Sequence, residues 1–419
     1  MTTMSVRKPQ PKVISLYSGA GGLDYGFEAA GFETVFANDF EHDSCQTLRM
    51  NRKWPVVERS IFDVPTEEIL EIAGVGVGEI DALIGGPPCQ PFSKSSYWVR
   101  GDAARLNDPR AATLDAYLRV LEEVQPRAFL LENVYGIAYS EKSEVMQLLL
   151  NKIDAINRKT GTRYRPQTAV LNAAWYGVPQ LRERFFLVAA RDGSDFHFPK
   201  AAFTTPSVAQ QALGTLPFFR TAWDALADIS PSPNEDLEIR GKWAGLLPSI
   251  PEGQNYLHHT ERGAGLPLFG WRTRYWNFLL KLAKRLPSWT IQAQPGPSVG
   301  PFHWDNRRLS HRELCRLQTF PDNVQVFGNR MSIQRQIGNA VPSLLAEVLA
   351  REIKTQLFGF RRTNEPLRLI PPDRSPVPPP ERVRAVPAEY KKLAGRHQAH
   401  PGTGKGPRSV QQRNDALFV

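Results

Sequence analysis

Residues 13–22 read VISLYSGAGG, an apolar run that opens into a glycine-rich turn. A helical pattern of apolar residues follows, through Phe27 and Phe32, so we expect a strand, a tight turn and a helix of the nucleotide-binding kind. Asp39 follows Gly19 by 20 residues, the spacing at which a carboxylate can hold ribose hydroxyls. An ordinary connection between a strand and a helix can carry the same glycines, so this turn alone does not decide the function.

A cysteine lies in a proline-flanked turn directly after a second apolar run. The run Ile80–Ile84 leads into GGPPCQPFS, residues 85–93, with Cys89 at its centre. Parallel α/β sheets place their chemistry at the carboxyl ends of strands, and the prolines restrict the backbone around the thiol. A rigidly aimed thiol suits a nucleophile, whereas a buried structural cysteine is the alternative for this residue type.

A carboxylate ends another short apolar run, about 40 residues further on. This run, AFLLENV, carries Glu132 and Asn133 at its carboxyl end. Cys89 and Glu132 would then meet at the same edge of one sheet. Taken singly, Glu132 could instead be a surface acid or a neighbour of a helix N-cap. Arg182 and Arg184, further along the chain, could equally be solvated charges on a strand.

A series of short motifs resembles those of the cytosine-5 DNA methyltransferases that use S-adenosylmethionine. Their common order and spacing are far more specific than any one of them. The motifs are Tyr17–Gly22 (YSGAGG), Asp39-Phe40, Pro88-Cys89-Gln90, Glu132-Asn133-Val134, Gln180–Arg184 (QLRER) after Tyr176–Pro179 (YGVP), Arg308–Leu314 (RLSHREL), Gln318–Pro321 (QTFP) and Gln336–Pro342 (QIGNAVP). Ser15 and Ser60 depart from the family pattern, because many members carry acidic residues at those two positions.

The resemblance implies a chemistry for these residues. Carbon 5 of cytosine is a poor nucleophile, and covalent addition at carbon 6 turns the ring into an enamine that can attack a methyl group. Cys89 would form that bond, and Glu132, with a raised pKa, would hold ring nitrogen 3. Arg184 would hold the exocyclic oxygen, while Asn133 and Arg182 keep the catalytic edge in register. A stacked cytosine is out of reach of the thiol, so the base must be rotated out of the duplex.

The resemblance also implies sites for S-adenosylmethionine and for double-stranded DNA. We expect DNA contacts from the polar loop after the cysteine and from an aromatic-basic cluster at 269–276, namely Gln90, Ser93, Ser95, Arg272 and Arg274. That cluster could equally be a small hydrophobic core with solvated arginines. The expected cofactor-binding residues are Tyr17, Ser18, Gly19, Ala20, Gly21, Gly22, Asp39, Phe40, Ser60, Ile61, Pro88, Leu114, Asn339 and Ala340.

The fold expected from these features is α/β, with a Rossmann-like, mostly parallel sheet flanked by helices, as in class I methyltransferases. The catalytic domain would cover residues 1–195 and a smaller, irregular target-recognition domain residues 196–304. The chain would return to the catalytic domain over residues 305–357, where Ser332–Leu357 reads as one capped helix. Residues 358–419 are rich in proline and carry twelve Lys or Arg against five Asp or Glu, a net +7 of the chain's +10. We expect this tail to be disordered.

The composition favours a soluble enzyme of the cytoplasm. A hydrophobic fraction of 41% over 419 residues is enough for a sizeable core. Cys45, Cys89 and Cys315 are too far apart for zinc-ligand spacing, so no metal site is expected, and three cysteines favour a reducing compartment. Neither a signal peptide nor a membrane span is expected. We expect a monomer that serves as the modification partner of a restriction endonuclease.

Three other functions compete with this interpretation. A member of the same family could methylate a cytosine of transfer RNA, although a recognition region of about 100 residues favours DNA. A nicotinamide dehydrogenase could share the glycine turn, but it would leave the cysteine and arginine motifs without a role. A non-catalytic DNA-binding or partner protein would have no use for an intact Cys89, Glu132 and Arg184.

Overall fold

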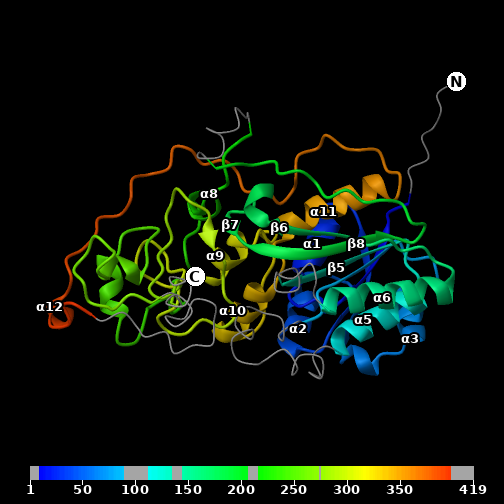
Figure 1. The fold of residues 1–419 in the computed structure, drawn as a ribbon, viewed down its shortest axis with the longest axis horizontal. Coiled ribbons are helices and arrows are strands. Elements are labelled where there is room, and N and C mark those ends of the chain that lie inside the picture. The colour runs from blue at the N-terminus through cyan, green and yellow to red at the C-terminus, as the bar shows by residue number, and fades with distance from the viewer. Residues whose placement is uncertain (1–8, 89–111, 135–143, 206–215, 273–274, 398–419) are drawn as a thin grey trace, which may run out of the picture.

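A central sheet of seven strands organises residues 12–190, which were predicted to lie in a catalytic domain (Figure 1). The computed structural model describes residues 9–88, 112–134, 144–205, 216–272 and 275–397. The strand order is β3-β2-β1-β4-β5-β8-β6; the first five strands are parallel, whereas β8 is antiparallel to β5 and β6. The predicted Rossmann-like, mostly parallel sheet is therefore confirmed. The strands are β1 (Lys12–Leu16), β2 (Glu33–Asp39), β3 (Val56–Glu58), β4 (Ala82–Gly85), β5 (Ala128–Val134), β6 (Gln167–Asn172) and β8 (Glu183–Ala190).

Helices cover both faces of this sheet, so its strands are apolar on both sides. In β5, Phe129 and Leu131 face one hydrophobic cluster and Leu130 faces the other, as the period of two in a strand requires. None of the described helices is both long enough and apolar enough to cross a membrane. The helices of this domain are α1 (Gly22–Ala29), α2 (His42–Asn51), η1 (Ile61–Asp63), α3 (Thr66–Ala73), α5 (Ala112–Val124), α6 (Glu144–Thr160), η6 (Ala173–Tyr176) and α11 (Ser343–Gln356).

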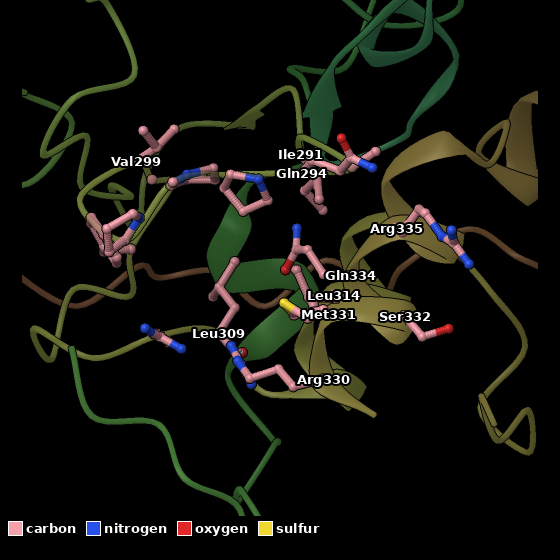
Figure 2. Close-up of a pocket in the computed structure, with 18 of the residues that line it drawn as sticks. Ile291, Gln294, Val299, Leu309, Leu314, Arg330, Met331, Ser332, Gln334 and Arg335 are labelled. Carbon is pink, nitrogen blue, oxygen red and sulfur yellow. Dashed lines mark hydrogen bonds between the residues drawn. The ribbon is translucent and has the colours of Figure 1, made fainter. Parts of the chain in front are cut away.

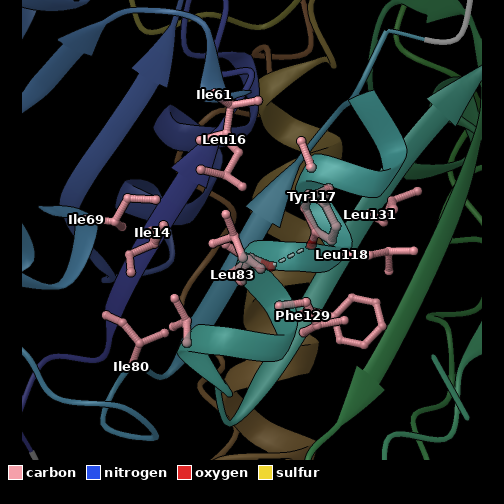
Figure 3. Packing of buried hydrophobic residues seen from close by; sticks show 14 of the residues in the cluster. Ile14, Leu16, Ile61, Ile69, Ile80, Leu83, Tyr117, Leu118, Phe129 and Leu131 are labelled. Carbon is pink, nitrogen blue, oxygen red and sulfur yellow. Dashed lines mark hydrogen bonds between the residues drawn. The ribbon is translucent and has the colours of Figure 1, made fainter. Parts of the chain in front are cut away.

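Tyr117 shows how tightly α5 packs on the sheet. Figure 3 shows its ring among Leu83, Phe129 and Leu131 on the face covered by α3, α5 and α6. The side chain is fully buried, and its hydroxyl donates to the carbonyls of Leu83 (3.2 Å) and Leu130 (3.1 Å). The one polar atom of this core residue is therefore satisfied, and the ring ties α5 to β4 and β5, the two strands that lead into the site.

The chain returns to the catalytic domain as two helices rather than the single helix predicted over Ser332–Leu357. Helix α10 covers Arg330–Asn339 and α11 follows from Ser343, with Ala340 extended and Pro342 non-helical between them. The expectation of one helix was wrong because Pro342 has no amide hydrogen and disfavours helical geometry at the residue before it. This break creates a sharp junction that lies against the glycine turn.

The described part of residues 196–304, predicted to form a target-recognition domain and called the recognition region below, has little regular structure of its own. Its interior is a cluster of apolar side chains that includes Leu247, Ile250, Tyr256 and Leu279. Two-residue strands, β7 (Gln180–Leu181) and β9 (Ser288–Trp289), pair in parallel and join this region to the catalytic domain. The other elements described from here to α10 are α8 (Ala222–Leu226), η7 (Ala244–Ser249), η8 (Tyr256–His259) and α9 (His311–Leu317).

The prediction of a disordered tail is wrong for residues 358–397. Phe358 is buried in the catalytic domain, and Tyr390, on the short helix α12 (Ala388–Lys391), is buried in the recognition-domain cluster. Apolar residues spaced among the prolines dock into two separate cores, so low overall hydrophobicity did not mean a lack of packing. Residues 398–419 lie outside the described part of the chain.

Candidate active site

A buried ion pair lies at the carboxyl edge of the sheet. Glu132 is near the end of β5, and Arg184 is near the start of the antiparallel neighbour β8, on a diagonal that brings the two side chains together. Arg184 Nε lies 2.8 Å from Glu132 Oε1, and only 12% and 11% of the two side chains are exposed. Two of the predicted catalytic residues therefore meet, and the reading of both as solvated surface charges is wrong.

Burial raises the pKa of the Glu132 carboxyl, and the positive charges of Arg184 and Arg182 oppose that rise. The same burial lowers the pKa of Arg184, while Glu132 counteracts the effect. A carboxyl group whose pKa is raised holds its proton more readily than a solvated one, which suits a group that shares a proton with a ring nitrogen. This electrostatic state is the one that the predicted role of Glu132 requires.

The segment that leads into the cysteine motif is pressed against Glu132. A Cβ built on Gly86 would lie 2.7 Å from Glu132 Oε2, so a larger residue here would displace the Glu132 carboxylate. Asn133 Nδ2 donates to the carbonyl of Pro87 at 3.2 Å and holds the same segment from the side. The described chain stops at Pro88 here, and Cys89 lies outside the described residues together with Gln90, Ser93 and Ser95.

Arg182 is a fully buried link between three parts of the molecule. Its guanidinium donates from Nη1 to the carbonyl of Ile291 (3.1 Å) and from Nη2 to the carbonyl of Gly338 (2.6 Å). Burial lowers its pKa well below the usual range, as does the charge of Arg184. These bonds join the β7–β8 segment to the recognition region and to α10. Arg182 is therefore placed to position the carboxyl edge of the sheet, not to touch a reacting group.

Two glutamines that sequence reasoning did not assign to the site extend this link. Gln180 accepts from the amide of Ile291 at 3.0 Å, and its Nε2 donates to Gln318 Oε1 at 2.9 Å. Gln318 in turn donates to the carbonyls of Ile337 (2.6 Å) and Ala340 (3.1 Å). Gln180 lies in the QLRER motif and Gln318 in the QTFP motif, so their place in these motifs was the signal in the sequence.

The glycine turn places its amides beside an acidic strand end. Gly19 N donates to Asp39 Oδ2 at 2.8 Å, and Glu41 N donates to the other carboxylate oxygen at 2.9 Å. Burial raises the pKa of Asp39, and the two amides oppose the rise. The carboxylate is only partly buried, so it keeps lone pairs for a ligand's hydroxyl groups. Ser18 Oγ lies 2.8 Å from Ser15 Oγ beneath the same turn.

The junction between α10 and α11 closes one side of the turn. A Cβ on Gly22 would lie 2.3 Å from the carbonyl oxygen of Val341 and 3.0 Å from Ala340 Cβ. Gly21 adopts a left-handed conformation with φ of 85° at the start of α1. Asn339 is exposed at the end of α10. The glycine turn near the start of the chain and the QIGNAVP motif at 336–342 therefore meet at Gly22.

The remaining predicted cofactor residues form two groups. In the first group, Tyr17 Oη donates to the carbonyl of Thr113 at 2.7 Å. Thr113 Oγ1 in turn donates to the carbonyl of Pro88 at 3.2 Å, so Tyr17 and Pro88 are linked through Thr113. Leu114 and Ile61 pack into the core below, Ile61 almost fully buried. Ser60 is half-buried beside Ile61, and Ala20 is buried within the turn.

These residues fit S-adenosylmethionine. Phe40 follows Asp39 with 61% of its surface exposed, a free aromatic face on which an adenine ring can stack. Asp39 offers carboxylate oxygens to a ribose, and nothing lies within 4 Å of a Cβ built on Gly19, so a ligand has room to approach the backbone there. Among the described residues, no group of three or more His, Cys, Asp or Glu side chains could hold a metal ion.

A cavity of about 880 Å³ opens next to this edge, between α10 and the 291–302 segment of the recognition region. Figure 2 shows Gln334 of α10 directed toward Ile291 and Gln294, with Arg330 and Arg335 on the same helix. Gln334 Nε2 donates to the carbonyl of Gln292 at 2.6 Å. Arg308 also lines the cavity, and burial together with the Arg308 charge lowers the pKa of Arg330. Arg330 pairs with Glu235 at 3.3 Å and Arg335 with Glu41 at 2.7 Å, and Asp43 also lines the cavity, so its walls carry charges of both signs.

Comparison with known proteins identifies the family. Residues 11–355 match the family described as C-5 cytosine-specific DNA methylase. The chain belongs to this family. It is 40% identical over 372 residues to Type II methyltransferase M.SacI of Streptomyces achromogenes, covering 82% of this chain and 93% of that protein. It is 33% identical over 349 residues to Type II methyltransferase M.NgoFVII of Neisseria gonorrhoeae, covering 82% and 86%.

A solved methyltransferase structure shares the fold of this chain. The Entamoeba histolytica methyltransferase EhMeth matches 84% of this chain and 99% of its own with a TM-score of 0.57, at 15% identity. The resemblance drawn from the motifs is confirmed. Of the two arginines predicted to touch DNA, Arg274 lies outside the described residues. Arg272 contributes its carbonyl and amide to Tyr256 Oη, and its guanidinium lies 5.8 Å from the Tyr275 ring centre.

Proposed function

We propose that this methylase transfers a methyl group from S-adenosylmethionine to carbon 5 of a cytosine in a specific double-stranded DNA sequence, through a covalent cysteine adduct on a base rotated out of the duplex. The observation that carries the proposal is the buried Glu132–Arg184 pair at the sheet edge where Gly86 leads into the Cys89 motif. Relatives named as Type II methyltransferases support a role as the modification partner of a restriction endonuclease. We place the enzyme in the cytoplasm as a monomer.

The residues divide the reaction among them. The Cys89 thiolate donates an electron pair to carbon 6, and ring electrons shift toward nitrogen 3, which takes a share of the Glu132 proton. Arg184 donates hydrogen bonds to the exocyclic oxygen, which stabilises the charge that develops there. S-adenosylmethionine, when bound, supplies an electrophilic methyl group on a sulfonium centre. Loss of the proton from carbon 5 then returns an electron pair to the ring, and the Cys89 sulfur leaves as thiolate.

The duplex is proposed to lie across the cavity beside α10. Arg308, Arg330 and Arg335 line that cavity, and contacts from arginines to phosphates position a duplex without reading its sequence. Arg182 connects Ile291, on the cavity wall, to the catalytic edge, so DNA seated here would be next to the reacting groups. The described aromatic-basic cluster at Arg272 would supply further contacts. The recognised sequence itself is not encoded in these phosphate contacts.

Covalent trapping tests the proposal. A duplex library that carries 5-fluorocytosine should form a stable adduct with the full chain and S-adenosylmethionine, and mass spectrometry should locate the adduct on Cys89. The Cys89→Ala variant should form none. An adduct on another residue, or none with any duplex, would contradict the mechanism.

Two further assays separate this function from its rivals. Bisulfite sequencing of DNA from cells that express the chain should show one methylated cytosine context. Transfer RNA, offered in parallel with duplex DNA, should accept no methyl group. Methylation of transfer RNA alone would favour the transfer RNA enzyme, and methylation of neither would favour a non-catalytic binding protein.

A further inference from the structure

The C-terminal strap, defined here as residues 358–397, lies beyond residue 355, where the match to the methylase family ends. It leaves the catalytic domain after α11, crosses the molecule and ends at α12 beside the recognition region (Figure 1). A segment outside the family's shared domain has no role assigned by the family. Its contacts nonetheless span both domains.

The first anchor of the strap is a buried carboxylate in the catalytic domain. Glu347 of α11 is fully buried and accepts from the amides of Arg368 (2.8 Å) and Leu369 (3.0 Å), while Arg351 Nη2 pairs with it at 2.6 Å. Hydrogen bonds from backbone amides to an ionised carboxylate are strong, and they hold the strap's backbone rather than a flexible side chain. The strap is therefore fixed to the catalytic domain at a defined place.

The second anchor is the short helix α8 at the start of the recognition region. Arg374 donates its amide to Asp224 Oδ1 at 2.8 Å and pairs with Asp228 at 2.8 Å. Asp373, next to it, pairs with Arg220 at 2.8 Å. These contacts turn the chain toward the recognition domain.

The third anchor is a buried charge cluster inside the recognition domain. Lys284 Nζ lies 2.9 Å from Glu252 and 2.7 Å from Glu381 of the strap, and Glu381 N donates to Glu252 at 2.7 Å. Lys284 and Glu252 are almost fully buried. Removing one partner from such a cluster leaves a buried charge without full compensation. Glu381 therefore stabilises the buried Lys284 although its own side chain is half exposed.

The last anchor is the aromatic ring of Tyr390. It stacks on Trp243 with ring centres 5.9 Å apart, and its hydroxyl donates to the carbonyl of Lys242 at 2.9 Å. A Cβ on Gly245 would lie 3.2 Å from the same hydroxyl, so the ring fills a fitted space. Tyr390 belongs to the same buried cluster as Leu247, and the recognition domain's core is incomplete without it.

We propose that the strap is a positioning element for target recognition, which holds the recognition domain at a set orientation over the catalytic edge. The described residues of the recognition domain form no extended hydrogen-bonded sheet of their own, and the strap both completes the domain's core and ties it to α11. This inference rests on the proposed function for its DNA readout. Its consequence is that damage to the strap weakens DNA use while cofactor binding, centred on α1 and β2, stays intact.

The test uses the full-length chain with Tyr390→Ala, Tyr390→Phe and Glu381→Gln, and with Lys392→Ala as the matched control, because Lys392 is exposed at the end of α12. We expect Tyr390→Ala to raise the KM for duplex DNA at least tenfold, with S-adenosylmethionine affinity by calorimetry changed less than twofold. Tyr390→Phe, which keeps the ring, should rescue most of the effect, and Glu381→Gln should fall between. Lys392→Ala should behave as the unchanged protein.

Limited proteolysis reads the strap independently of catalysis. In Tyr390→Ala the recognition region should be cut faster while the catalytic domain stays protected, whether or not methyl transfer is observed. Unchanged DNA kinetics and unchanged cleavage would overturn the proposal. So would an equal loss of DNA and cofactor binding in both Tyr390→Ala and Glu381→Gln, since that would make the strap a general stabiliser. Absence of methyl transfer by the unaltered chain would count against the proposed function alone.

Discussion

The catalytic sheet and the recognition domain achieve order by different means. The sheet relies on a continuous ladder of seven strands whose side chains alternate between two cores, as Phe129 and Leu130 illustrate. The recognition domain relies on contacts between distant side chains, such as Tyr390 on Trp243. The difference shows that one half of this enzyme follows from local periodicity, while the other half depends on which distant segments meet.

The same contrast runs through the candidate site. Glu132 and Arg184 come from neighbouring strands, so the ladder itself brings these two proposed catalytic groups together. Arg182 and Gln180 act across domains and contact Ile291, more than 100 positions away. Chemistry is thus supplied by the regular half, and alignment with the irregular half is supplied by buried polar links.

The largest expected effect tests the regular half alone. Replacing Glu132 with Gln removes the transferable proton but keeps the shape, so kcat should fall by about 10²–10⁴-fold, as for general acids elsewhere. The KM for DNA should change little. Activity of the unaltered enzyme should fall as pH rises through the raised pKa of Glu132, because the protonated form is the active one. A variant that kept its full kcat would remove Glu132 from the mechanism.

The next effect tests the contact between the glycine turn and the helix junction. Gly22→Ala would place a methyl group 2.3 Å from the carbonyl of Val341, so we expect a loss of about 3 kcal/mol in unfolding free energy and weaker S-adenosylmethionine binding. Gly74→Ala is the matched control, because it makes the same change from glycine to alanine at a position where nothing lies within 4 Å of the new Cβ. Its left-handed backbone should cost only about 1 kcal/mol. Equal losses in chemical denaturation would show that crowding at Gly22 is unimportant.

A smaller effect concerns Asp24, a fully buried carboxyl in the first turn of α1. Neither oxygen has a hydrogen-bond partner within the described chain, and burial raises its pKa to about 7, with the nearby Ser15 hydroxyl opposing. The negative charges of Glu28 and Asp39 add to the rise. The folded state therefore holds a proton that the unfolded chain has lost, so this group's contribution to stability falls as pH rises from about 4 to 7 and levels off above.

Asp24→Asn should remove that pH dependence. We expect the variant to be about 1–2 kcal/mol more stable than the unaltered protein at pH 8, less than the roughly 4 kcal/mol of the full shift because the amide keeps a burial cost of its own. The gain should shrink as pH falls and reverse by about pH 5, because the folded unaltered protein then holds its proton while the variant keeps the burial cost of the amide. Urea unfolding at several pH values measures it; a difference that does not change with pH would rule out the buried titration.

The smallest effect separates exposed ion pairs from the buried cluster under the strap. Lys152 and Asp115 pair on the surface between α6 and α5, with 38% and 56% of the side chains exposed. Lys152→Ala should cost less than about 0.5 kcal/mol, since water screens such pairs. A thermal shift as large as that of Glu381→Gln would contradict the distinction drawn between the two kinds of pair.

Much of the catalytic half could be predicted because its signals are local. The strand ending in Glu132 and the turn at Gly19 each appear as a short pattern with a fixed period, and parallel topology then brings their ends to one edge. The break at Pro342 was missed although its chemistry is local, because the surrounding helical pattern masked it. The docking of Phe358 and Tyr390 could not be seen, since their partners lie in two different cores.

By itself, the sequence determined the family, the order of the motifs and the side chains that carry charge and sulfur, because these are properties of residue type and spacing. Only the tertiary structure decided that Glu132 and Arg184 share a dry site with shifted pKa values, that Arg182 spans two domains, and that a proline-rich tail is a packed strap. The physical reason is that desolvation, hydrogen-bond satisfaction and core completion arise from neighbours far apart in the chain. No local pattern records those neighbours.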